Sequence, residues 1–355
     1  MSAGVGDTVD LANPGGKRAG IPITSAAVGD TVLVKKSRYG YPISSAAVGD
    51  TVLVKRVNGK LVGVAGGGES DILTDIDIRT DMYAEGIVAT PSGDIIQVWA
   101  GQIVTPPTAY VKIYSSSGRF KRKFGSYGTG NGQFNVPQCV AVDLSGNIYV
   151  SDLYNYRIQK FTSAGQYLLQ WGSNGTGDGQ FSLDVAGIAV DSDGYVYVVD
   201  RDSQRLQKFD STGHFITKWS LDPSSFGCTV SPTTGNIWVV VIGHSRMDEF
   251  TPTGTLVSSW SSGLLYYPYT IAFDSENNIY VADKLNYRIQ KFTEHGTYLG
   301  VLWGTPGDGD GQFNMAVHVT VDKNTNNVYV GDTENFRVQQ FTPTGTFIRK
   351  WYSGR

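Results

Sequence analysis

The chain of 355 residues lacks several features that would place it in common classes of protein. No run approaches the roughly 18 apolar residues of a membrane-crossing helix, so we expect no membrane span. The N-terminal segment MSAGVGDTVDLANPGG has no basic stretch followed by an apolar core, so no signal peptide is visible. An intracellular or virion protein, or a mature form that has lost a leader, is compatible with this start.

Cysteine and histidine are scarce. Cys139 and Cys228 fall on apolar segments in different parts of the chain, which favours two free, buried thiols over a disulfide. A catalytic zinc typically takes three protein ligands and keeps one position open. Because the sequence has just four histidines, at positions 214, 244, 295 and 318, we expect neither a bound metal nor another cofactor.

Positive charge is in the minority over most of the chain. Residues 1–66 carry eight Lys or Arg and four Asp, whereas the remaining residues carry 21 Lys or Arg against 28 Asp or Glu. Neutralisation of phosphates supplies most of the affinity of nucleic-acid-binding surfaces. An acidic main part therefore argues against nucleic acid as a partner.

What the chain does have is one repeated pattern. The clearest copies run from Val140 to Gly172 and from Ile271 to Gly304, and each has four short apolar or alternating segments separated by turns rich in Gly, Asn, Asp, Ser, Thr and Pro. One turn recurs six times and ends in Gly118, Gly165, Gly213, Gly254, Gly296 and Gly345. Four strands in every 40 to 53 residues are typical of propeller blades. We predict an all-β fold, a six-bladed β-propeller with four-stranded blades.

The repeated strings also resemble a known family. GNIYVSD, YRIQKF and GTGDGQF, with the second set NNIYVAD, YRIQKF and GDGDGQF, are similar to NHL repeats over about residues 86–351. This resemblance implies a β-propeller, usually of six blades. Blade four departs from the pattern at residues 238–250, and blade one has an insertion around residues 101–109. All four strands of blade six come from the C-terminal part, so we expect the ring to close without a borrowed strand, although residues 72–78 could add one.

Two recurring features look like functional sites but fit the scaffold better. An Asp at the end of the second strand and an Arg at the start of the third recur in four copies, which favours a structural pair over a catalytic carboxylate. The pairs are Asp152–Arg157, Asp200–Arg205, Asp283–Arg288 and Asp332–Arg337. The Gly-rich loops at residues 172–180 and 304–312 lack the Lys-Ser/Thr and the helix of a phosphate loop. Asp308 and Asp310 resemble part of a calcium loop without its bidentate Glu, so we expect no metal there.

Residues that break the repeat are the candidates for a binding face. Tyr266, Tyr267 and Tyr269 crowd the loop that enters blade five, and Trp238 is an odd residue of blade four. Exposed Tyr and Trp supply rigid contact area with a polar end, which suits sugars, peptides or proteins. The alternative is that these rings fill a short connection between blades. The predicted face is completed by His244, His318 and Arg201.

Residues 1–66 contain a second, shorter repeat that resembles no family we can name. Gly-Asp-Thr-Val occurs three times, and two of the copies continue into apolar runs made of Val32, Leu33, Val34, Val52, Leu53 and Val54. Each run predicts a strand, but so small a module has too little core of its own. We therefore expect these residues to be buried against the propeller, another copy of the chain or a larger assembly. Residues 67–85 are assigned to a linker or an extra strand, and residues 86–355 to the propeller.

Together these observations favour a non-catalytic structural or recognition protein. In this hypothesis the N-terminal module mediates self-assembly or anchoring, as in a surface filament, a sheath or a virus particle, and the propeller displays a binding face. Other copies of the protein are the expected partners, and an extracellular surface or a virion is favoured over the cytoplasm. Two alternatives stay open. One is a monomeric scaffold that binds a peptide or a carbohydrate; the other is a metal-dependent lyase of the propeller type, with His244 and His318 as its candidate ligands.

Overall fold

The computed structural model describes residues 9–10, 32–34, 52–57, 60–65, 82–101 and 107–352. The chain divides into two compact units, Met1–Thr80 and Asp81–Arg355. The extra strand considered for residues 72–78 and most of the insertion in blade one lie outside the described residues.

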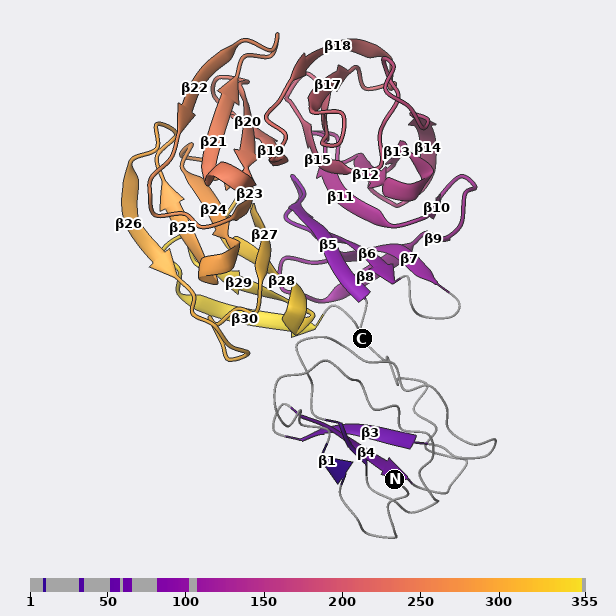
Figure 1. Ribbon diagram of the computed structural model, residues 1–355, viewed down its shortest axis with the longest axis vertical. Coiled ribbons are helices and arrows are strands. Elements are labelled where there is room, and N and C mark those ends of the chain that lie inside the picture. Colours follow the sequence, from indigo (N-terminus) through magenta and orange to yellow (C-terminus); the bar gives the residue numbers. More distant parts are fainter. Residues whose placement is uncertain are drawn as a thin grey trace. The chain divides into compact units, whose positions relative to one another are not determined.

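The second unit is a ring of six four-stranded antiparallel sheets, counted over the described residues (Figure 1). The prediction of a six-bladed, all-β propeller is therefore confirmed. Blade one begins at Met82, upstream of the predicted start at residue 86. From the inner to the outer strand, the blades are β5 (Met82–Ala89), β6 (Ile95–Gly101), β7 (Thr108–Tyr114) and β8 (Phe120–Phe124); β11 (Pro137–Val142), β12 (Ile148–Asp152), β13 (Arg157–Phe161) and β14 (Tyr167–Trp171); β15 (Val185–Val190), β16 (Val196–Asp200), β17 (Arg205–Phe209) and β18 (Phe215–Ser220); β19 (Ser225–Val230), β20 (Ile237–Val241), β21 (Arg246–Phe250) and β22 (Leu256–Trp260); β23 (Pro268–Phe273), β24 (Ile279–Asp283), β25 (Arg288–Phe292) and β26 (Tyr298–Trp303); and β27 (Ala316–Val321), β28 (Val328–Asp332), β29 (Arg337–Phe341) and β30 (Phe347–Tyr352).

The connections define two ends of the ring. Turns between the first and second strands and between the third and fourth strands lie at one end, which we call the turn face. The opposite end, the loop face, carries the connections between second and third strands and the loops between blades. On the loop face lie four 3-10 turns, η1 (Leu153–Asn155), η2 (Ile242–His244), η3 (Lys284–Asn286) and η4 (Thr333–Asn335), and the short paired segments β9 (Ser126–Tyr127) and β10 (Gln133–Phe134).

The core lies between neighbouring blades, and this position explains the strand sequences. The second and third strands of blades two and three are buried at every residue, because both faces of each sheet are covered by another blade. The outer strand β18 alternates between half-buried and exposed residues instead. Its partner contacts lie on one face, as expected for a strand at the rim of a propeller. One apolar cluster between blades two and three, for example, joins Tyr149 and Ile158 to Val196 and Phe209.

We call the turn between the first and second strands of a blade its first turn, and the turn between the third and fourth strands its third turn. The glycine that ends the third turn of each blade has a packing role in addition to its backbone role. Gly213 has a φ of +85°, and a Cβ atom built on it would lie 2.6 Å from Cδ2 of Trp171 on the outer strand of the preceding blade. The equivalent glycines approach an aromatic ring in the same way: Gly118 on Trp351, Gly165 on Phe124, Gly254 on Trp219, Gly296 on Trp260 and Gly345 on Trp303. This contact joins each blade to the previous one around the whole ring.

Among the described strands, the ring closes between blades six and one without exchange of a strand, as expected, because each of the two sheets consists of four consecutive strands. Side chains join the two blades. The backbone N–H of Gly86 donates to Nε2 of His318 (3.2 Å), and that of Ala89 donates to Oγ1 of Thr320 (3.0 Å). On the turn face, the Asn324 side chain donates to the Pro91 carbonyl (2.9 Å).

In the first unit, the described segments form a small sheet in the order β1-β2-β4-β3. Its strands are β1 (Val9–Asp10), β2 (Val32–Val34), β3 (Val52–Val57) and β4 (Lys60–Ala65). Both apolar runs of the short repeat are therefore strands. Each of them pairs antiparallel with β4, and β2 also pairs with β1 in parallel.

Candidate functional site: the loop face and the central channel

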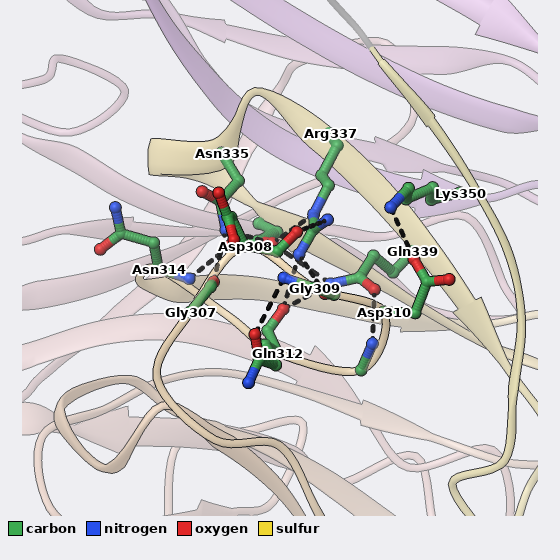
Figure 2. A network of polar contacts seen from close by, with 12 residues as sticks. Gly307, Asp308, Gly309, Asp310, Gln312, Asn314, Asn335, Arg337, Gln339 and Lys350 are labelled. Atoms are coloured by element: carbon green, nitrogen blue, oxygen red, sulfur yellow. Dashed lines mark hydrogen bonds and ion pairs between the residues drawn. The ribbon is translucent and has the colours of Figure 1, made fainter. Parts of the chain in front are cut away.

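In blade six, the Asp–Arg pair organises a hydrogen-bond network under the loop face (Figure 2). Oδ2 of Asp332 accepts from Arg337 Nε (2.7 Å), Asn335 Nδ2 (2.9 Å) and Gln339 Nε2 (3.2 Å). Its Oδ1 accepts from the backbone N–H of Asn314 (2.8 Å). Burial raises the pKa of Asp332, and these donors oppose that rise because they stabilise the carboxylate. Both carboxylate oxygens are thus occupied by the protein's own N–H groups.

The Gly-rich loop at residues 304–312, which connects blades five and six, closes around the Arg337 guanidinium. Arg337 donates to the carbonyls of Asp308 (2.6 Å), Gly309 (2.8 Å) and Gln312 (2.8 Å). Loop amides are also used internally, since Gly309 N–H donates to Gln312 Oε1 (2.9 Å) and Gly311 N–H donates to Gln339 Oε1 (3.0 Å). These contacts agree with the structural interpretation of the loop.

The same network recurs in other blades and has a structural role. Arg157 donates to Asp152 and to the loop carbonyls of Gly130 and Gln133, and Arg205 donates to Asp200 and to the carbonyl of Gln180. Arg288 likewise pairs with Asp283. Of the two weak metal candidates, Asp310 is paired with Lys350 at 2.6 Å and Asp308 offers its carbonyl to Arg337.

Blade four replaces this network with a different set of ion pairs. Val241 stands where blades two, three, five and six have Asp, and Arg246 pairs instead with Asp248 (2.8 Å) and Asp222 (3.2 Å). His244 Nδ1 lies 3.2 Å from the same Asp222 carboxylate, and the His244 side chain is 56% exposed. His244 is therefore accessible on the loop face.

Aromatic rings and cations from neighbouring blades form a continuous series, which we call the aromatic–cation row. Its members are Arg201, Phe226, Tyr267, Tyr269, Lys284 and His318. The ring of Tyr269 lies 4.1 Å from that of Phe226 and meets His318 edge-on at 5.8 Å. Lys284 Nζ lies 4.2 Å from the centre of the Tyr269 ring and 5.8 Å from that of Tyr267. At the other end, the Arg201 guanidinium lies 5.7 Å from the Phe226 ring and pairs with Asp184 at 2.9 Å. Residues from blades three, four, five and six meet in this row.

The predicted tyrosines have different roles. Tyr266 is 58% exposed, and its backbone N–H donates to Asp283 Oδ1 (2.6 Å), so its loop is held while its ring faces solvent. Tyr267 and Tyr269 are partly buried in the row. The φ of +59° at Tyr267 belongs to the scaffold, because the equivalent residues Val136 and Met315 have φ values of +66° and +64°.

Two members of the predicted face are in the interior. Trp238 was wrongly placed on a surface: it is 1% exposed and packs between Trp260 and Phe273, both at 6.3 Å between ring centres. An apolar ring on a second strand is covered by the next blade, whatever blade it belongs to. His318 is 6% exposed and accepts the Gly86 hydrogen bond at the closure of the ring. Two further members of the row were not predicted: Lys284, at the start of η3, and Phe226, which lies on β19 and is 4% exposed.

A cavity of about 720 Å³ occupies the centre of the ring. Near the loop face its wall is formed at the bulge that begins each inner strand, by Gly86, Cys139, Gly187, Gly227, Thr270 and His318. From there it extends to the first turns of the turn face, where it is lined by Leu144, Ser192, Pro232 and Lys323. Burial raises the pKa of the Cys228 thiol in this wall to about 12, and neither Cys139 nor Cys228 forms a disulfide.

The blades, the ring and the repeated Asp–Arg networks define a β-propeller with NHL repeats. Comparison with known families agrees: a family described as 6-bladed beta-propeller matches residues 138–248, and the NHL repeat matches residues 313–341. The resemblance to NHL repeats is thereby confirmed. A search of curated protein sequences finds no match.

Several solved structures share the fold. A catalytically inactive virginiamycin B lyase from Staphylococcus aureus, solved with quinupristin, is 11% identical, with a TM-score of 0.54 over 77% of this chain and 85% of the lyase. A streptogramin B lyase is 13% identical, with a TM-score of 0.53 over 76% of this chain and 82% of the other. A protein of unknown function from Bacteroides thetaiotaomicron is 15% identical, with a TM-score of 0.55 over 73% and 68%. At these identities the likeness concerns the fold alone.

The described residues contain no helix long and apolar enough to cross a membrane. Nor do they contain a group of three or more His, Cys, Asp or Glu side chains arranged to hold a metal ion.

Proposed function

We propose that this protein works by binding rather than by catalysis, with the loop face of blades three to six as its recognition surface and the N-terminal module as its means of self-assembly or anchoring. The aromatic–cation row carries the first half of the proposal. Rigid rings beside positive charges are the side chains that dominate protein-recognition surfaces, and the exposed Tyr266 extends the row into solvent. A surface filament, a sheath or a virus particle is the kind of assembly that fits this division of labour.

The strand order of the N-terminal sheet supports the second half. Within the described part of the module, β3 is an edge strand that pairs with β4 alone. An edge strand presents unpaired backbone N–H and C=O groups to another chain. The run Val52, Leu53 and Val54 lies on this edge, whereas Val32, Leu33 and Val34 lie on the inner strand β2. We therefore place the contact with another copy on β3.

Truncation tests the self-assembly. The full chain and a chain lacking residues 1–66 would be compared by size-exclusion chromatography with light scattering, and their folding by circular dichroism. The full chain is expected to form oligomers, and the truncated chain to be a folded monomer, because the propeller forms its own compact unit. Leu53→Lys in the full chain should also prevent assembly, whereas Leu33→Ala on the inner strand serves as the comparison. A truncated chain that still assembles would refute this part of the proposal.

A monomeric scaffold for a peptide or carbohydrate is the second candidate, and the exposure of Tyr266 favours it specifically. It predicts that the full chain is already a monomer in the light-scattering experiment. It also predicts that Tyr266→Ser and Lys284→Met abolish capture from an array of peptides and glycans without changing the unfolding midpoint. The lyase names belong to the similar structures and are not carried over to this chain.

A further inference from the structure

The central channel holds one amine that the propeller scaffold does not explain. The second residue of the first turn, in blades one to six, is Pro91, Leu144, Ser192, Pro232, Ser275 and Lys323. Lys323 alone in this set is charged, and its exposed side chain lines the cavity. A cation at this position is not required by the turn, because five other blades build the turn without one.

The ammonium group of Lys323 has carbonyl partners but no carboxylate partner among the described residues. Its Nζ donates to the backbone carbonyls of Phe273 and Asp274, from the neighbouring blade. The Asp274 carboxylate is already engaged by Lys291 Nζ (2.9 Å) and by the backbone N–H of Asn278 (2.8 Å). Asp322, on the same turn as Lys323, accepts from Thr325 Oγ1 (2.8 Å) and Asn324 N–H (3.0 Å).

Of the other charged groups that line the channel, Lys208 and Asp191 have partners of their own, and Asp193 is exposed. Lys208 lies over the Tyr195 ring at 4.1 Å. Asp191 accepts from the Tyr197 hydroxyl (2.9 Å) and from the N–H groups of Asp193 and Tyr195. Partial desolvation by the surrounding protein lowers the pKa of Lys323 to about 8, and the nearby Asp274 charge opposes this shift. Among the described residues, the Lys323 amine thus donates to two backbone carbonyls, forms no ion pair with a carboxylate and can be reached from the cavity.

We propose that the channel is a binding site for small organic carboxylates, whose carboxylate group pairs with Lys323 while the apolar part lies against the inner strands. The carboxylate of the ligand accepts a hydrogen bond from the Lys323 ammonium group. Because both groups are charged, this hydrogen bond is stronger than one between neutral groups. The Val, Ala and Ile side chains of the inner strands supply an apolar wall for the rest of the ligand. This site lies toward the turn face and does not rest on the function proposed for the loop face.

Because the carboxylate binds the protonated amine, affinity should depend on pH in an unusual range. With a pKa of about 8, the protonated fraction of Lys323 falls about tenfold from pH 7 to pH 9. The affinity for a carboxylate should therefore also fall about tenfold. A lysine with the ordinary pKa of about 10.4 would stay protonated throughout. Lys323→Arg keeps the charge at all these pH values, so it should bind at pH 7 and lose the pH dependence.

Titration calorimetry of the full chain with acetate, butyrate and benzoate tests the proposal, with benzamide as the neutral counterpart of benzoate. We expect at least one carboxylate to bind, benzamide not to bind, and Lys323→Met to lower the affinity tenfold or more. Lys121→Met on the outer strand of blade one is the control and should leave binding unchanged. The proposal is overturned if none of the three acids binds, if Lys323→Met binds like the unmodified chain, or if affinity is the same at pH 7 and pH 9.

Discussion

The network of blade six contains two ion pairs made by aspartates, one buried and one exposed. The buried pair is Asp332 with Arg337. Their side chains are 0% and 1% exposed, and every group of the pair is hydrogen-bonded. Lys350 and Asp310, drawn in the same view (Figure 2), form an equally short ion pair with 29% and 54% of their side chains exposed. The distances are alike, but water screens the second pair and not the first. The value of an ion pair here depends on its burial, not on its length.

This difference predicts unequal effects of two matched substitutions. Arg337→Met leaves Asp332 buried without its cation and should lower the free energy of unfolding by about 3–5 kcal/mol. Lys350→Met breaks the exposed pair and should cost less than about 1 kcal/mol. Urea unfolding followed by tryptophan fluorescence measures both. Equal losses would show that the buried network does not hold the joint between blades five and six.

At the scale of a structural element, the third turns are determined by two requirements at once. The type of turn needs a residue with positive φ, and the neighbouring blade places an aromatic ring where a Cβ would lie. The first turns share the backbone requirement without the ring: Gly194 has the same φ of +85° as Gly213, but its nearest neighbour is Ser211 Cβ at 3.7 Å. Comparing Gly194 with Gly213 therefore distinguishes the effect of backbone conformation from the effect of side-chain packing.

Alanine at these two glycines separates the two costs. Gly194→Ala should lose about 1–2 kcal/mol of stability from its left-handed backbone alone. Gly213→Ala should lose a further 1–3 kcal/mol or so, because Trp171 must move. Urea unfolding gives the total for each variant, and near-ultraviolet circular dichroism should change for Gly213→Ala alone. The packing argument fails if both variants lose the same stability and keep the same aromatic signal.

For the whole molecule, the central question is whether the closure of the ring is a weak point. Blades five and six are joined by a hydrogen bond from Val319 N–H to Thr270 Oγ1 (3.0 Å). Blades six and one are joined in the same manner from Ala89 N–H to Thr320 Oγ1 (3.0 Å). The closing joint thus uses the same kind of link as an internal joint, although it connects residues 231 positions apart.

We therefore expect Thr320→Val and Thr270→Val to cost the same, about 1–3 kcal/mol each, because each leaves one partly buried N–H without its acceptor. Both variants should unfold in a single transition by urea, measured by fluorescence and by circular dichroism. An additional early transition in Thr320→Val alone would mean that the ring opens at its closure before the blades unfold.

Much of the fold and less of the site could be predicted from the sequence. The six turns, the four strands of each blade and the role of the Asp–Arg pairs were predictable, since each copy repeats the same local pattern. Tyr266 was predicted to be exposed and is, whereas Trp238 was misplaced. A strand's period of two says which residues share a face, but it does not say that both faces of that strand are covered.

The sequence by itself determined the number of blades, their strand order and their turn residues, because these depend on neighbours along the chain and on the backbone freedom of glycine. The tertiary structure alone decided which side chains from different blades meet. Phe226 and Tyr269 are in contact although they are 43 positions apart in the sequence, and Lys323 lines a cavity whose wall comes from all six inner strands. Such contacts are set by how the sheets pack around a common axis, and that packing is not encoded in any single copy of the repeat.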